Sequence, residues 1–100
     1  MKPLGTNDLN HALRKLGSNW LCQNNMLEGQ FEFKSYLKAL SFVNAVARLA
    51  EKQKHHPEIH FNYCTVKLLL TTHDLNNQLS EKDFNFAERT EELILKFSEH

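Results

Sequence analysis

Hydrophobic residues recur along this chain at two spacings, one typical of helices and one typical of strands. Apolar positions three and four residues apart predict three helices, while short alternating or continuous apolar runs between turn residues predict four strands. In chain order, the expected elements are a helix over Asn7–Leu16, strands over Trp20–Gln23 and Met26–Phe33, a helix from about Ser35 to Lys54, strands over about Ile59–Cys64 and Val66–Thr72, and a helix that begins at Ser80–Asp83 and runs to about Phe97.

Residues with special backbone preferences mark the ends of several elements. Thr6 is placed to cap the first helix and Gly17 to end it. The pair Asn24-Asn25 tolerates positive φ, which favours a tight hairpin turn. The run Ser80–Asp83 resembles a capping box in which aspartate takes the place of glutamate. Pro57 prevents the long helix from continuing into the following strand.

The expected long helix has an unusually narrow polar stripe. Nearly all its other residues are apolar, whereas a surface helix needs an apolar arc only a little over about 100° wide. We therefore expect one side to pack on a sheet and another to meet a second helix or a partner chain, which predicts an oligomer. The stripe consists of Lys34, Lys38, Ser41, Asn44, Arg48 and Lys52.

The order α-β-β-α-β-β-α predicts an α+β fold. Short connections within each pair of strands favour hairpins, hence a four-stranded antiparallel sheet with helices packed on one face. The nearly continuous apolar run Val66–Thr72 suits a central strand covered on both faces. Alternation places Ile59, Phe61 and Tyr63 on one face of the preceding strand. At 100 residues, the chain is expected to be one domain over 1–100.

Composition excludes several classes of protein. Twelve Lys and Arg balance twelve Asp and Glu, which argues against a nucleic-acid binder or an electrostatic membrane anchor. No apolar run approaches the roughly 18–20 residues that span a bilayer, and the N-terminus has no signal-peptide core. Cys22 and Cys64 are too few for a disulfide framework. These features predict a cytoplasmic protein with reduced thiols.

Histidine is the unusual residue, with six in the chain, and three lie near one another in sequence. His55-His56-Pro57 follows the long helix, and His73-Asp74 follows a strand. Because histidine titrates near pH ~6.5, it can both give and take a proton at neutral pH. Elimination of water needs both roles, so a pair of histidines facing a flat substrate could catalyse it without a metal.

Other interpretations of these residues remain open. His55 and His56 could simply interact favourably with the dipole at a helix C-terminus, and His73-Asp74 could be an ordinary turn. Three histidines with a carboxylate could also bind zinc. The spacing differs from the HExxH pattern, however, and adjacent histidines tend to point in different directions, which favours a site with no metal.

The segment from Glu51 to Asp83 resembles the pterin-4a-carbinolamine dehydratase family. The family signature, an acid followed by His-His-Pro, an aromatic residue, His and Asp, is matched in order. The flanking segments are similar too, and the resemblance covers roughly residues 18–95. The matching positions are Glu51, His55, His56, Pro57, Tyr63, His73 and Asp83, with Trp20, Phe31-Glu32-Phe33, Tyr36, Ala39, Phe42 and Val66–Asp74 alongside.

The resemblance implies dehydration of 4a-hydroxytetrahydropterin to quinonoid dihydropterin, which recycles the cofactor of aromatic amino acid hydroxylases. The pterin is then the substrate, and no cofactor is implied. His55 and His73 would be the acid/base pair around the C4a hydroxyl and N5, and His56 would position the pterin. Glu51 would orient a histidine. The remaining substrate-binding candidates are Pro57, Thr71, Thr72 and Asp74. Family members form homodimers or homotetramers.

The sequence departs from the family pattern in places. Leu75–Ser80 lacks the usual Gly-Gly, and Ile59 and Lys54 replace a tryptophan and an acid of the animal members. Two alternative functions follow from the resemblance. Some members act as dimerisation cofactors of a transcription factor, so a non-catalytic interaction protein of the same fold is one. A member that acts on another pterin, such as a folate or a molybdopterin-type compound, is the other.

Overall fold

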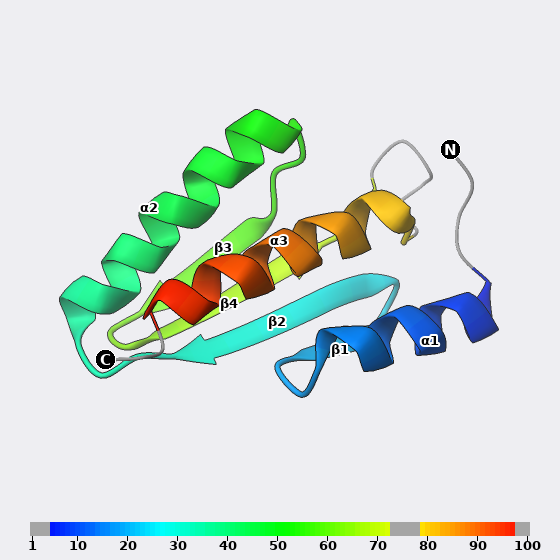
Figure 1. Ribbon diagram of the computed structural model, residues 1–100, viewed down its shortest axis with the longest axis horizontal. Helices are drawn as coiled ribbons and strands as arrows, with labels where there is room; N and C mark the ends of the chain where they lie inside the picture. The colour runs from blue at the N-terminus through cyan, green and yellow to red at the C-terminus, as the bar shows by residue number, and fades with distance from the viewer. Residues whose placement is uncertain (1–4, 73–78, 98–100) are drawn as a thin grey trace.

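The expected order of elements is confirmed. The computed structural model describes residues 5–72 and 79–97 of the chain. Three helices and four strands follow one another as α-β-β-α-β-β-α (Figure 1). Their bounds are α1 Thr6–Leu16, β1 Trp20–Gln23, β2 Met26–Glu32, α2 Tyr36–Gln53, β3 Glu58–Asn62, β4 Thr65–Leu70 and α3 Glu81–Phe97.

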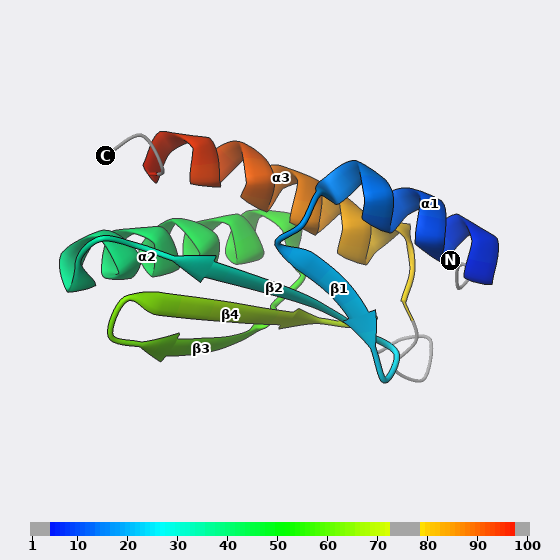
Figure 2. The same cartoon turned by 90° about the horizontal axis from the view of Figure 1, so that it is seen from below.

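The molecule has two layers, with the three helices on one face of the sheet (Figure 2). The strands are ordered β1-β2-β4-β3, and every neighbouring pair is antiparallel. β2 and β4 are therefore central, as expected for Val66–Thr72. Both hairpins expected from the sequence form, and the long β2–β4 pairing joins them. None of the helices in the described ranges is long and apolar enough to cross a membrane.

The core lies between the sheet and the helices. Phe42 and Val46 of α2, Phe86 of α3, and Leu27 and Leu68 of the sheet are fully buried there. α3 packs alongside α2, where Phe42 and Phe97 meet edge to face at 5.8 Å. This contact accounts for part of the wide apolar arc of α2.

Backbone geometry at the turns follows the expected chemistry, with one exception. Asn24 and Asn25 have φ of 54° and 60°, as a tight hairpin requires, and Gly17 ends α1 at φ 100°. The exception is the start of α1. The prediction that Thr6 caps this helix was wrong, because Thr6 is already its first residue and Gly5 is the N-cap.

Two further expectations need correction. Tyr63 does not share a strand face with Ile59 and Phe61, because β3 ends at Asn62 and Tyr63 adopts φ 53° in the turn, 71% exposed. Nor is β4 covered on both faces. Its residues alternate between fully buried and half-buried, since helices lie on one side of the sheet only.

Candidate active site

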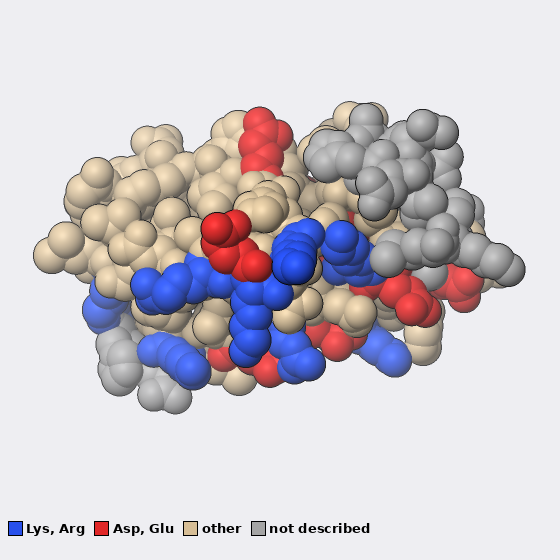
Figure 3. Space-filling model, turned by 90° about the horizontal axis from the view of Figure 1, so that it is seen from above, with Lys and Arg blue, Asp and Glu red and all other residues tan. Residues whose placement is uncertain are grey.

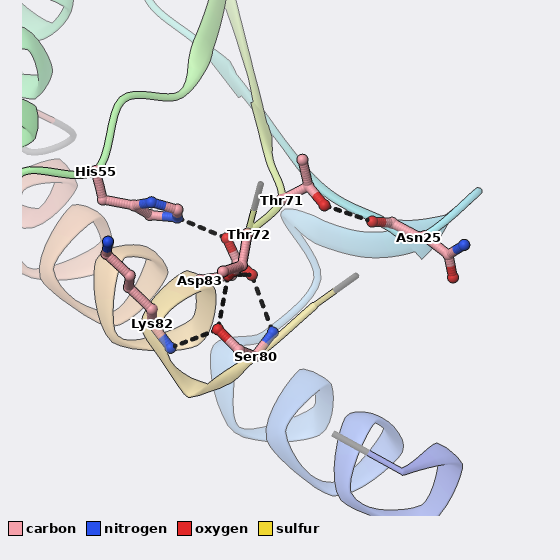
Figure 4. A network of polar contacts seen from close by, with 7 residues as sticks. All are labelled: Asn25, His55, Thr71, Thr72, Ser80, Lys82 and Asp83. Atoms are coloured by element: carbon pink, nitrogen blue, oxygen red, sulfur yellow. Dashed lines mark hydrogen bonds and ion pairs between the residues drawn. The ribbon is translucent and has the colours of Figure 1, made fainter. Parts of the chain in front are cut away.

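Three ends of secondary structure meet at one place in the molecule. They are the residues after α2, the residues after β4 and the start of α3 (Figure 4). His55 comes from the first, Thr72 from the second, and Ser80 and Asp83 from the third. A buried network of polar side chains joins all three, and it includes two of the residues named from the sequence as site candidates.

The centre of this network is a hydrogen bond between His55 and Asp83. His55 Nε2 lies 2.6 Å from Asp83 Oδ1, with His55 only 7% exposed and Asp83 fully buried. The turn after α2 directs the ring inward. Lys54 adopts a left-handed conformation, and the backbone N–H of His55 donates to the carbonyl of Ala50 at 3.1 Å. The helix end thus places the imidazole.

The second carboxylate oxygen of Asp83 is also fully engaged. Oδ2 accepts hydrogen bonds from Thr72 Oγ1 at 2.7 Å and from the backbone N–H of Ser80 at 3.0 Å. Because the Thr72 hydroxyl donates its one proton to Asp83, Ser80 Oγ must be the donor in the 2.7 Å hydrogen bond between the two hydroxyls. The backbone N–H of Lys82 in turn donates to Ser80 Oγ at 3.2 Å.

These bonds confirm the capping box expected at the start of α3. Ser80 accepts from the helix N-terminus, and Asp83 reaches back to the backbone N–H of Ser80. The same aspartate that caps the helix holds His55. One side chain therefore has a structural role and a position in the site.

The bond to Asp83 determines which nitrogen of His55 carries a proton in the neutral ring. A carboxylate can only accept, so Nε2 must be the protonated nitrogen. Nδ1 then has a free lone pair, and no hydrogen bond from a described residue occupies it. No fully buried side-chain nitrogen or oxygen in the described ranges lacks a partner, so an Nδ1 without a hydrogen bond must be partly exposed to solvent. Nδ1 is thus available to exchange a proton with a bound molecule.

His56 points the other way. Its Nε2 lies 2.6 Å from Glu51 Oε2, one turn earlier on α2, and their side chains are 64% and 78% exposed. The adjacent histidines therefore have different partners: a buried aspartate for His55 and an exposed glutamate for His56. Pro57, which follows them, is half-buried.

The threonines after β4 also differ in their surroundings. Thr72 is 2% exposed and belongs to the buried network. Thr71 donates to the backbone carbonyl of Asn25 at 3.1 Å, which ties the end of β4 to the β1–β2 turn. His73 and Asp74 lie outside the described residues, so their predicted places beside His55 stay predictions.

Asp83 and Ser80 were absent from the site residues inferred from the sequence. Two signals could have identified them. Asp83 is the last position of the family signature, and Ser80–Asp83 had already been interpreted as a capping box. No metal centre is evident, because residues 5–72 and 79–97 hold no group of three His, Cys, Asp or Glu arranged to bind an ion.

Comparison with known proteins places this site in a family. The family model described as Pterin 4 alpha carbinolamine dehydratase matches residues 2–93. Two curated relatives bear the name "putative pterin-4-alpha-carbinolamine dehydratase". The protein of Alkaliphilus metalliredigens is 36% identical over 90 residues, covering 89% of this chain and 80% of its own. That of Trichormus variabilis is 38% identical over 84 residues, covering 84% and 88%.

Solved structures agree with this placement. A transcriptional coactivator/pterin dehydratase from Brucella melitensis has a TM-score of 0.82 at 32% identity, covering 89% of this chain and 95% of its own. A pterin dehydratase-like protein, described as a RuBisCO assembly factor in the alpha-carboxysome, has a TM-score of 0.67 at 31% identity, with 78% and 92% covered. By sequence and by fold, the chain belongs to the pterin 4 alpha carbinolamine dehydratase family.

Proposed function

We propose that this chain is a pterin-4a-carbinolamine dehydratase, a lyase that converts 4a-hydroxytetrahydropterin into quinonoid dihydropterin and water. Membership of the family supports the reaction class. The observation that carries the proposal is the buried hydrogen bond of His55 with Asp83, which fixes the ring and leaves Nδ1 without a hydrogen bond from any residue that the structure describes. An oriented imidazole with one unoccupied nitrogen is suited to general acid/base catalysis.

The reaction needs two proton transfers. The bond between C4a and the hydroxyl oxygen breaks, and that oxygen leaves as water after it takes up a proton. The proton on N5 is removed, and N5 and C4a form the new double bond. We assign one of these transfers to Nδ1 of His55 and the other to His73. After turnover, the histidine that removed the N5 proton carries one proton more than at the start, and the histidine that protonated the hydroxyl carries one fewer. Transfer of that proton from the first to the second through solvent water restores both.

The remaining candidates would hold the substrate rather than move its protons. His56 would chiefly position the pterin. Its 2.6 Å bond to Glu51 supports the proposal that Glu51 orients this histidine. The exposure of this pair suits the rim of a site that substrate enters. Pro57, Thr71, Thr72 and Asp74 complete the proposed binding residues. The hydroxyl of Thr72, already bonded to Asp83, would act by supporting that aspartate.

The proposed setting follows the same line. The pterin is the substrate and no further cofactor is needed, and the chain works as a homodimer or homotetramer in the cytoplasm. There it would recycle a tetrahydrobiopterin-type cofactor for an aromatic amino acid hydroxylase.

A non-catalytic interaction role is the second candidate. The names of the two structural relatives, a transcriptional coactivator/pterin dehydratase and a RuBisCO assembly factor, favour it. A protein that only binds partners has no need for a fixed buried imidazole, so the geometry of His55 favours the enzyme.

A dehydration assay separates the two candidates. A hydroxylase generates the 4a-carbinolamine in situ, and the absorbance of quinonoid dihydropterin is followed. We expect His55→Ala and His73→Ala each to lower kcat by about 10²–10⁴-fold, and the double variant to lose more if one histidine partly substitutes for the other. His60→Ala is the matched control, since His60 is an exposed histidine on β3 that pairs with the exposed Glu58.

The same assay contains the outcomes that would reject the proposal. Turnover by the unmodified chain no faster than in buffer would leave the interaction role as the better candidate. Strong inhibition by a chelator would reject metal-free catalysis.

A further inference from the structure

Lys82, in the first turn of α3, is a half-buried cation at the candidate site. Figure 4 shows its side chain pointing from α3 toward His55, while its backbone N–H donates to Ser80 Oγ. The helix dipole disfavours a positive charge in the first turn of a helix, and partial burial makes an ammonium without an anionic partner costly. We therefore expect Lys82 to have such a partner.

The acidic residues around Lys82 are engaged elsewhere. Both oxygens of Asp83 accept hydrogen bonds from other groups, and Glu51 is bonded to His56. Glu81 lines a groove between α1 and α3, on a different side of the helix from Lys82, because successive residues of a helix lie about 100° apart. The ion pairs found in the described part of the chain do not include Lys82. Its charge is thus available to a bound molecule.

The surface at the end of α2 is also positively charged. Arg48, Lys52 and Lys54 are exposed there, and they too are absent from the ion pairs found among the described residues. Figure 3, which looks onto the α2 side, shows Lys and Arg side chains gathered in a band across this face. Because the whole chain has a net charge of zero, this band is a local feature that favours the approach of an anion from this side.

The chemistry of the proposed reaction indicates which part of the substrate lies near Lys82. Nδ1 of His55 can exchange a proton with N5 of the pterin, or with the hydroxyl on C4a, only from about 2.6–3.2 Å away. N5 is bonded to C6, the ring atom that carries the substituent by which pterins differ. A substituent on C6 therefore begins close to His55, where a long side chain that points toward this histidine can meet it.

We propose that Lys82 recognises an anionic group, a carboxylate or a phosphate, on the C6 substituent of the pterin. The inference rests on the proposed function, because it requires the pterin to bind at His55. Lys82 is then a specificity-determining residue, and the proton transfers belong to the histidines. A lysine suits either anion, since its ammonium acts as a compact point charge and does not need the paired oxygens that an arginine matches.

Binding of stable aromatic pterins tests the proposal without turnover. In the first pair of probes, 6-methylpterin is neutral and pterin-6-carboxylate carries a carboxylate at the same position. In the second pair, 6-hydroxymethylpterin is neutral and its phosphate ester is anionic. The affinity of the full chain for each compound is measured by isothermal titration calorimetry at neutral pH. The two pairs show separately whether a carboxylate or a phosphate is preferred.

We expect the anionic member of at least one pair to bind at least about tenfold more tightly than its neutral partner. Lys82→Gln should lower this ratio of affinities by at least about tenfold, and Lys82→Arg should retain it, because the charge is kept. The matched control is Lys67→Gln, since Lys67 is also half-buried but lies on β4, on the face of the sheet opposite the helices. Circular dichroism checks that each variant is folded.

Three results would overturn the proposal and leave the proposed function intact. Equal affinity for anionic and neutral pterins would show that no anionic group is recognised. A preference that survives in Lys82→Gln would assign it to another cation. A loss of affinity in Lys82→Gln that is the same for every compound would show that Lys82 contacts the ring. Failure of all the pterins to bind would instead reject the proposed function, and this inference with it.

Discussion

Both oxygens of the Asp83 carboxylate accept hydrogen bonds, and this matters for His55. An aspartate bonded on one side only could rotate and let the imidazole change tautomer. Here Thr72 and Ser80 hold Oδ2, so Oδ1 has a fixed direction toward Nε2. The orientation of His55 therefore depends on residues from two other elements, beyond its own position at the end of α2.

Replacement of the aspartate by its amide tests this dependence. In Asp83→Asn, the amide NH₂ must face either the N–H of Ser80 or Nε2 of His55, and in the second case it favours the wrong tautomer. We expect kcat to fall by between about 10- and 10⁴-fold. The free energy of unfolding should fall by about 1–3 kcal/mol. The dehydration assay and urea titration measure the two effects.

The control for this change is Glu88→Gln, the same acid-to-amide change at an exposed position of α3. It should alter neither quantity measurably. Unchanged kcat in Asp83→Asn, with a normal control, would mean that the carboxylate acts only as a helix cap and does not position His55.

The partly buried thiol of Cys22 leads to a prediction that depends on pH. Burial raises the pKa of the Cys22 thiol above its ordinary value. At pH 8 less of this thiol is therefore ionised in the folded chain than in the unfolded chain, and the thiolate is the reactive form. Iodoacetamide should alkylate Cys22 more slowly in the folded chain than in urea, as peptide mass spectrometry would measure.

The raised pKa of Cys22 also determines how the free energy of unfolding changes with pH. Because the folded state favours the neutral thiol, this contribution to stability is complete below the ordinary pKa and is lost as pH rises through the raised value. Equal alkylation rates in the folded and unfolded chains at pH 8 would contradict the prediction.

At the scale of the element, the two longer helices are both capped by serine, but the two caps have different surroundings. Ser35 accepts from the N–H of Lys38 at the start of α2, at the opposite end of that helix from His55. Ser80 caps α3 inside the buried network, where its hydroxyl also touches Thr72. The same local chemistry therefore has consequences for the site in one helix only.

The matched pair Ser35→Ala and Ser80→Ala separates capping from support of the site. Each should lower the free energy of unfolding by about 0.5–2 kcal/mol through loss of the cap. We expect only Ser80→Ala to lower kcat as well, because it removes a hydroxyl from the network around Asp83. Chemical denaturation and the dehydration assay measure the two effects. An equal loss of kcat in both variants would show that helix stability alone controls activity.

At the scale of the whole molecule, part of the apolar surface of α2 is still uncovered. α3 covers one flank, but Leu37 remains 71% exposed beside an exposed aromatic group. In that group Tyr36 stacks on Phe61 at 5.2 Å and lies near Tyr63. The sequence predicted that a second apolar side of α2 meets another helix or a partner chain. α3 leaves this apolar surface uncovered, so it is available to a partner chain.

We expect light scattering at micromolar concentration to give the mass of a dimer or tetramer. Leu37→Glu should lower that mass by placing a charge in the apolar surface, and Leu95→Glu is the control, since Leu95 is comparably exposed on α3. A monomeric mass for the unmodified chain would contradict the prediction of an oligomer.

The sequence could predict the elements and their order because periodicity and turn residues are local signals. Asn24-Asn25, Gly17 and the run Ser80–Asp83 each specify backbone geometry within a few residues. Prediction from the sequence failed for features that depend on which residues are neighbours in the folded structure. Tyr63 continued the alternation of β3 but lies in the turn, and the coverage of β4 depends on which face of the sheet the helices occupy.

The site was predictable to the same extent. The candidate residues could be listed from the motif, but their division into buried and exposed partners could not, because it depends on contacts across 28 positions for His55 and Asp83 against 5 for His56 and Glu51. A carboxylate that caps a helix looks like a purely local signal until the fold brings an imidazole to it.

The left-handed turn at Lys54 has one more consequence, for insertions and deletions. The two imidazoles that follow it are chemically identical, and only the count of residues from the helix end decides which of them enters the interior. Loss of a single residue at this junction would bring the second histidine to the inward position, and gain of one would bring a residue other than these histidines there, while both histidines stay in the sequence. The length of this connection should therefore vary less among working homologues than the identity of residue 54 itself.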